Sequence, residues 1–186
     1  IKGCKIKMLL PKTGLKWIAT SPNIPSFAYD IGYSITGLGA QEGTFSHGIG
    51  TAYPFRMLSN NQLSPKELKR KLDSYAIPGL ELKPIRTKNK NGQFIEGLYV
   101  GISNWNTLKP TALSFYMMAL SIEISPSNPF RQTTHSALFN KHVGSTDWWK
   151  ELTEHRGSPR VDQFLKKWEL ENLKFRKAVS SYLIYE

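Results

Sequence analysis

The spacing of apolar residues along the chain predicts three helices, and the first covers residues 63–76. Leu68 and Leu72 lie four positions apart and share one face of that helix. Ser64 and Glu67 form an S-x-x-E capping box, in which each side chain bonds a free backbone N–H of the first turn. This box marks where the helix begins.

The other two predicted helices differ in how apolar residues surround them. Residues 110–123 are apolar on nearly every side, which predicts burial on more than one face. Residues 159–180 place their apolar positions near one stripe, formed by Val161, Phe164, Leu165, Trp168, Phe175 and Val179. The last helix should therefore bury a single face and leave its lysines in water.

Alternating apolar positions predict strands at residues 80–86 and 94–102, joined by a polar turn into a hairpin. Residues 182–185 predict a short terminal strand. Residues 11–62 are rich in Gly, Pro, Ser and Asn, which favours long loops and short strands there. The class predicted is α+β, with a mixed and mostly antiparallel sheet packed against about three main helices.

The chain has 186 residues, enough for one domain with a sizeable core. No apolar run approaches the roughly 20 residues that cross a bilayer. Its 25 Lys and Arg against 14 Asp and Glu give a net charge of +11, which favours a polyanionic partner. The start at Ile1, with no signal pattern after it, favours a piece of a longer polypeptide.

The sequence holds no motif of a metal hydrolase, a P-loop or a dinucleotide-binding domain. His135 and His142 are seven positions apart, a spacing without an established metal geometry. We therefore expect no metal and no cofactor, and ordinary surface or packing histidines. The segment 42–51 crowds three glycines among hydroxyl, carboxyl and imidazole groups, which fits either a ligand-binding loop or a Gly-rich structural turn.

The stretches TGLKWIATSPNIPS, EGTFSHGIGTAYPF and WELENLKFRKAVSSYLIY resemble the C-terminal half of the exo-β-N-acetylmuramidase family of bacterial cell-wall recycling enzymes, formerly a domain of unknown function. The resemblance implies a glycoside hydrolase with a Rossmann-like N-terminal half, here absent, and a cleft between the halves. It further implies that the partners are peptidoglycan fragments or muramic-acid saccharides and the protein's own N-terminal domain. An exported protein, periplasmic or extracellular in a bacterium, is expected.

The same resemblance implies a set of substrate-binding residues: Ser21, Asn23, Glu42, Thr44, Ser46, His47 and Thr51. Four of them, Asn23, Glu42, Thr44 and Thr51, are expected to converge on one concave surface. Glu42 is also the candidate catalytic carboxylate of this chain. The family's catalytic pair is expected mainly in the N-terminal half, so the isolated domain should hydrolyse little.

The sequence departs from the family pattern at two positions, which leaves other functions open. The family usually carries an amide and a guanidinium where this sequence has Phe45 and Ile49, so groups suited to a sugar carboxylate are missing. A non-catalytic basic module that binds the cell wall and a divergent inactive paralogue are the alternatives. The basic residues are dispersed and match no nucleic-acid-binding motif, so no nucleic-acid partner is expected.

Overall fold

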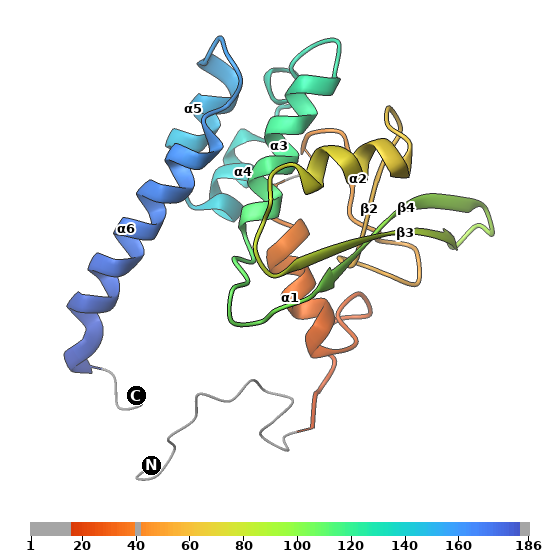
Figure 1. The fold of residues 1–186 in the computed structure, drawn as a ribbon, viewed down its shortest axis with the longest axis horizontal. Helices are drawn as coiled ribbons and strands as arrows, with labels where there is room; N and C mark the ends of the chain where they lie inside the picture. Colours follow the sequence, from red (N-terminus) through yellow and green to blue (C-terminus); the bar gives the residue numbers. More distant parts are fainter. Residues whose placement is uncertain (1–15, 40–41, 183–186) are drawn as a thin grey trace.

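The computed structural model describes residues 16–39 and 42–182, and Figure 1 shows their arrangement. The elements follow in the order α1 (Phe27–Thr36), β1 (Phe45–Ser46), β2 (Met57–Asn60), α2 (Pro65–Asp73), β3 (Leu80–Lys88), β4 (Phe94–Ile102), α3 (Ala112–Ile124), the 3-10 helix η3 (Pro129–Arg131), α4 (Ser136–Val143), α5 (Thr146–Glu154), α6 (Val161–Val179) and the 3-10 helix η4 (Ser180–Tyr182). The predicted α+β class is confirmed.

The four strands form one sheet in the order β1-β2-β4-β3, and each neighbouring pair is antiparallel. The predicted hairpin is confirmed, with Leu80 opposite Ile102 and Lys88 opposite Phe94. A Cβ at Gly97 would lie 2.2 Å from the Leu58 carbonyl oxygen. Glycine at this position therefore lets β2 pair closely with β4.

Helix α3 lies between two hydrophobic cores, which explains why its sequence is apolar nearly all round. Leu113, Met117 and Leu120 face the sheet and helices α1 and α2. Phe115 and Met118 face the second core, which is built mainly from α4, α5 and the start of α6. In Figure 1, α2 lies over the sheet on one side of α3, and α5 and α6 lie on the other.

The capping box that predicted the start of α2 is present. The Ser64 side chain accepts a hydrogen bond from the Glu67 backbone N–H, and the Glu67 carboxylate accepts from the Ser64 backbone N–H. Leu68 and Leu72 are buried in the first core. Local sequence and tertiary packing thus agree for this helix.

Among the described residues, three α-helices were not predicted, and the expectation of loops and short strands throughout residues 11–62 is wrong for α1. Ser26 precedes α1 without a side-chain capping bond, and Gly32 lowers its helix propensity. Gly32 is required because a Cβ there would lie 2.6 Å from the Phe55 carbonyl oxygen. Tertiary packing therefore selects this helix. The other two helices not predicted are α4 and α5.

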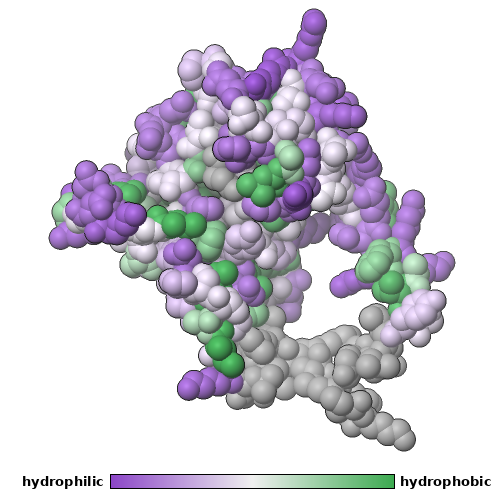
Figure 2. Space-filling view, turned by 180° about the vertical axis from the view of Figure 1, so that it is seen from behind, coloured by the Kyte–Doolittle hydropathy of each residue, from purple (hydrophilic) through white to green (hydrophobic). Residues whose placement is uncertain are grey.

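The predicted stripe of α6 is packed only along its first half. Phe164, Leu165 and Trp168 contact the second core, whereas Leu173 and Phe175 are 57% and 65% exposed. Figure 2 shows these apolar side chains gathered toward the far end of the helix. Tyr182, the first residue of the predicted terminal strand, lies in η4, and the rest of that strand lies outside the described residues.

Within the described ranges, no helix combines the length and apolar character needed to cross a membrane.

Candidate functional site

Two glycines of the Gly-rich segment 42–51 adopt the positive φ angles that other residues rarely adopt, and they set the backbone path of the segment. Gly48 and Gly50 have φ angles of 80° and 82°. A Cβ at Gly48 would lie 2.3 Å from the Tyr53 carbonyl oxygen, so only glycine fits. The Thr51 hydroxyl donates to the Gly48 carbonyl at 2.7 Å and accepts from the Tyr53 N–H at 3.0 Å. Thr51 thereby stabilises the turn with its own side chain.

Thr44 is also held within the fold. The Asn60 side-chain amide donates to the Thr44 hydroxyl at 2.8 Å and to its carbonyl at 3.0 Å. The Thr44 backbone N–H donates to the Ser121 hydroxyl of α3 at 3.3 Å. Ser46, at the end of β1, is exposed. These bonds fix the start of the Gly-rich segment against the sheet and α3.

Glu42 is the residue of this segment with the most suggestive surroundings. Its side chain is 13% exposed, and Oε2 accepts a hydrogen bond from the Thr133 hydroxyl at 2.7 Å. The His135 Nδ1 lies 3.4 Å from the same oxygen, with the His135 side chain 64% exposed. Both contacts use Oε2, and within the described ranges Oε1 has no hydrogen-bond partner.

His47, in the same segment, packs against an aromatic ring from outside the segment. Its ring meets Phe55 edge to face at 4.9 Å, and Phe55 meets Tyr33 at 4.9 Å. Burial lowers the pKa of His47, and the Thr36 backbone offsets that effect only in part, so the imidazole is neutral at pH 7. Its Nδ1 is buried without a hydrogen-bond partner in the described chain. Phe55 has a φ of 58°, a conformation that costs free energy for a bulky residue.

Ser21 and Asn23 form a local turn ahead of α1, where the Asn23 N–H donates to the Ser21 hydroxyl at 3.1 Å. Of the candidate residues expected from the sequence, only these two are joined to one another by a described hydrogen bond. The convergence of Asn23, Glu42, Thr44 and Thr51 on one concave surface stays a prediction.

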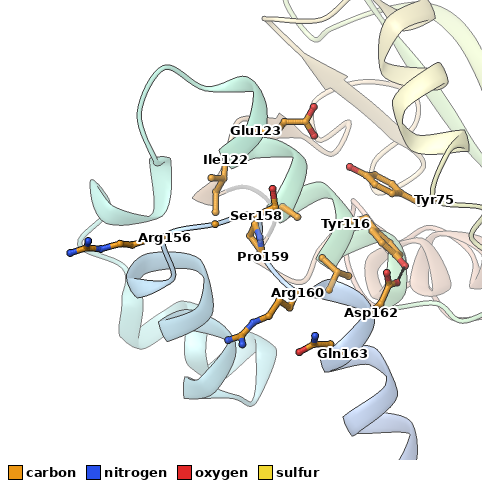
Figure 3. Close-up of a pocket in the computed structure, with 13 residues that line it drawn as sticks. Tyr75, Tyr116, Ile122, Glu123, Arg156, Ser158, Pro159, Arg160, Asp162 and Gln163 are labelled. Atoms are coloured by element: carbon orange, nitrogen blue, oxygen red, sulfur yellow. Dashed lines mark hydrogen bonds between the residues drawn. The ribbon is translucent and has the colours of Figure 1, made fainter.

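A second region has the shape of a ligand site. A cavity of about 700 Å³ opens between the turn after α2, helix α3 and the segment 156–163 that leads into α6 (Figure 3). Its polar lining includes Tyr75, Tyr116, Glu123, Ser158, Asp162 and Gln163. None of the candidate residues expected from the sequence lines it.

Sequence reasoning missed these residues for identifiable reasons. Thr133 lies 91 positions from Glu42, and no local pattern marks such a pair. Tyr75 and Tyr116 occupy positions of helical apolar faces, where an aromatic residue ordinarily fills a core. The phenol group is the one hint, because a buried Tyr hydroxyl requires a partner. In the described ranges, no group of His, Cys, Asp and Glu could hold a metal ion.

Comparison with known proteins gives concordant matches. The chain is 26% identical over 191 residues to the peptidoglycan beta-N-acetylmuramidase NamZ of Bacillus subtilis, covering 100% of this chain and 44% of that protein. A solved DUF1343 family protein from Bacteroides fragilis superposes with a TM-score of 0.82 at 23% identity, covering 97% of this chain and 48% of the other. The chain thus spans less than half the length of each relative.

The family described as the C-terminal part of the exo-beta-N-acetylmuramidase NamZ matches residues 31–185. That range includes the Gly-rich segment, both cores and α6. The expected family resemblance is confirmed, and the chain belongs to the family of NamZ C-terminal domains.

Proposed function

We propose that this chain is the substrate-binding C-terminal domain of a peptidoglycan exo-β-N-acetylmuramidase, which releases terminal N-acetylmuramic acid. Family membership supports the enzyme class. The observation that carries the binding role is the Glu42 carboxylate. Thr133 donates a hydrogen bond to one oxygen, His135 Nδ1 lies 3.4 Å from the same oxygen, and the other oxygen has no hydrogen-bond partner among the described residues. A fixed acceptor of this kind orients a sugar hydroxyl without a further loss of side-chain entropy.

In this proposal Glu42 orients the saccharide, and the catalytic carboxylates belong to a Rossmann-like domain of the complete protein. Glycosidases use two carboxyl groups at a controlled separation. The Thr133 hydroxyl fixes one oxygen of the Glu42 carboxylate, which suits a side chain that positions a ligand. The protein acts where peptidoglycan lies, outside the cytoplasm of a bacterium.

The test is binding of N-acetylmuramic acid to the 186-residue chain, followed by calorimetry or by shifts of backbone amide resonances. We expect Glu42→Gln to weaken binding about tenfold, equivalent to ~1.4 kcal/mol. Glu154→Gln serves as the matched control, because Glu154 is exposed at the end of α5. Equal affinities of the two variants would remove Glu42 from the site.

A release assay with a chromogenic N-acetylmuramide tests where catalysis resides. The 186-residue chain alone should release little product. In the complete enzyme, Glu42→Gln should lower turnover by about one to two orders of magnitude. Substantial turnover by the isolated chain would contradict the assignment of the catalytic carboxylates to the other domain.

The net charge of +11 supports a second candidate, a non-catalytic module that adheres to anionic wall polymers. Adhesion of this kind weakens steeply with salt because exposed charges are screened. Retention on purified cell walls at low and high NaCl separates the two functions. Loss of retention in salt together with no muramic acid binding would favour the module.

A further inference from the structure

Two stacked tyrosines form one side of the cavity in Figure 3. The rings of Tyr75, in the turn after α2, and Tyr116 on α3 lie 4.4 Å apart at an interplanar angle of 16°. The Tyr116 hydroxyl donates to Asp162 Oδ1 at 2.5 Å, which ties α3 to the first turn of α6. Burial, followed by this hydrogen bond, raises the pKa of Tyr116. The phenol therefore remains a donor at neutral pH.

Two of the four charged side chains that line the cavity, Glu123 and Arg160, are held in ion pairs. Arg160, just before α6, pairs with Glu151 at 2.6 Å. Lys71 on α2 pairs with Glu123 on α3 at 2.5 Å. In Figure 3, Arg156 and Arg160 extend away from the two tyrosines. Such pairing holds the walls in place before a ligand arrives, which lowers the entropy cost of binding.

Beside the two tyrosines, the groups left for a ligand are hydroxyl donors and carboxylate acceptors above an apolar floor. Arg156 also lines the cavity and has no ion-pair partner among the described residues, but it extends away from the tyrosines (Figure 3). The floor consists of Ala119, Ile122 and Val161. Tyr75 and Ser158 contribute hydroxyls, and Asp162 and Glu123 each keep a second carboxylate oxygen. A volume of about 700 Å³ falls in the range typical of small-molecule sites. An anionic ligand beside the tyrosines would meet the carboxylates of Asp162 and Glu123 and be repelled by them.

We propose that this cavity is a second saccharide site, which binds a neutral pyranose of a glycan chain separately from Glu42. A pyranose offers several hydroxyl donors to the carboxylate and phenol oxygens, and its C–H groups pack on the apolar floor and the tyrosine rings. It carries no charge to conflict with Asp162 or Glu123. The site would hold a glycan strand at a point other than the one that binds terminal muramic acid.

The test uses N,N′-diacetylchitobiose, a neutral disaccharide, and the 186-residue chain. Binding is followed by the amide resonances of Gly157, Ser158 and Gln163, which line the cavity. Ser158→Trp should weaken binding at least about tenfold, because the indole fills the cavity. Ser158 is exposed, so the substitution is compatible with folding. Ser181→Trp, on exposed η4, is the matched control and should leave binding unchanged.

Two further variants separate this proposal from the proposed function. Asp162→Asn keeps the shape of the side chain and removes the charge of an acceptor, so it should weaken disaccharide binding several-fold. Glu42→Gln should leave disaccharide binding unchanged and lower only the affinity for N-acetylmuramic acid. A loss of disaccharide binding in Glu42→Gln would assign both ligands to one site and overturn the proposal.

The remaining outcomes are equally decisive. Disaccharide binding that survives Ser158→Trp within twofold would exclude the cavity as its site. Absence of binding by the wild-type chain at millimolar disaccharide would refute a saccharide site here. Cadaverine serves as a cationic probe, and shifts of the cavity amides with cadaverine but not with the disaccharide would assign the carboxylates to an amine ligand instead.

Discussion

The ion pair between Glu151 and Arg160 predicts how the free energy of unfolding changes when either partner is removed. Both the size of that change and its pH dependence follow from the unequal burial of the two side chains. The Glu151 side chain is 3% exposed, whereas that of Arg160 is 50% exposed. Glu151 accepts from the Arg160 backbone N–H at 2.9 Å, from Nε at 2.9 Å and from an outer guanidinium nitrogen at 2.6 Å. The pair joins α5 to the residue before α6.

Removing either partner should destabilise the fold, but to different degrees. Glu151→Gln removes the charge while keeping most of the volume, and the exposed Arg160 can be rehydrated, so the expected loss is about 1–3 kcal/mol. Arg160→Ala leaves a buried carboxylate with only a backbone donor, and an uncompensated buried charge costs more. The double variant should therefore be more stable than Arg160→Ala alone, a coupling that a double-mutant cycle measures.

The pH dependence has opposite signs in the wild type and in Arg160→Ala. Hydrogen bonding by Arg160 lowers the pKa of Glu151. A lowered folded-state pKa gives stability that is present above the unfolded pKa, about 4.3, and is lost as pH falls through the folded pKa. Without Arg160, burial raises the carboxyl pKa instead. Protonation then relieves the buried charge, so the deficit of Arg160→Ala should shrink as pH falls from 7 toward 4.5.

Urea unfolding followed by tryptophan fluorescence measures these free energies at pH 7 and pH 4.5. The expected order of stability at pH 7 is wild type, Glu151→Gln, double variant and Arg160→Ala, with the last two closer together at pH 4.5. A deficit of Arg160→Ala that does not change with pH would contradict the assignment of its cost to a buried carboxylate. Equal effects of the two single variants would refute the argument from burial.

Three further outcomes are expected. Trp148→Ala should cost about 3–5 kcal/mol, since Trp148 is fully buried, and calorimetry should show a melting temperature lower by about 2–4 °C per kcal/mol. Gly48→Ala should destabilise clearly more than Gly50→Ala in urea titrations, because both have positive φ but only Gly48 would bring a Cβ against the Tyr53 carbonyl. His47→Gln should reduce the stability lost between pH 7 and 5, because the lowered pKa of His47 makes its contribution decline as pH falls below about 6.5.

How far the sequence predicted the fold depended on whether local patterns and tertiary packing agree. Helix α2 carries its capping box and one apolar face, so its start and its buried side were both predicted. Helices α4 and α5 also carry local signals. Gly144 ends α4 with a positive φ of 73°, and Ser145 caps α5 by accepting from the Trp148 N–H at 3.4 Å. Helix α1 lacks such signals, and its Gly32 makes sense only once Phe55 packs against it.

The candidate site was less predictable because its contacts are long-range. The Gly-rich segment was identified from composition, yet Thr51 and Thr44 bond within the fold, as a structural turn requires. Glu42 acquires its surroundings from a loop 91 positions away. The cavity at Tyr75 and Tyr116 joins the turn after α2, helix α3 and the start of α6, three segments that no sequence pattern associates.

Helix α6 shows what an apolar pattern establishes and what it leaves open. The predicted stripe continues at helical spacing from Phe164 and Trp168 to Phe175 and Val179, but only the first two contact the second core. Side chains four positions apart share a face whatever lies against them, so periodicity identifies the face and not its partner. An isolated helical segment of this length is only marginally stable in water. Because helix formation is cooperative, the packed first half of α6 stabilises the helical conformation of the exposed second half.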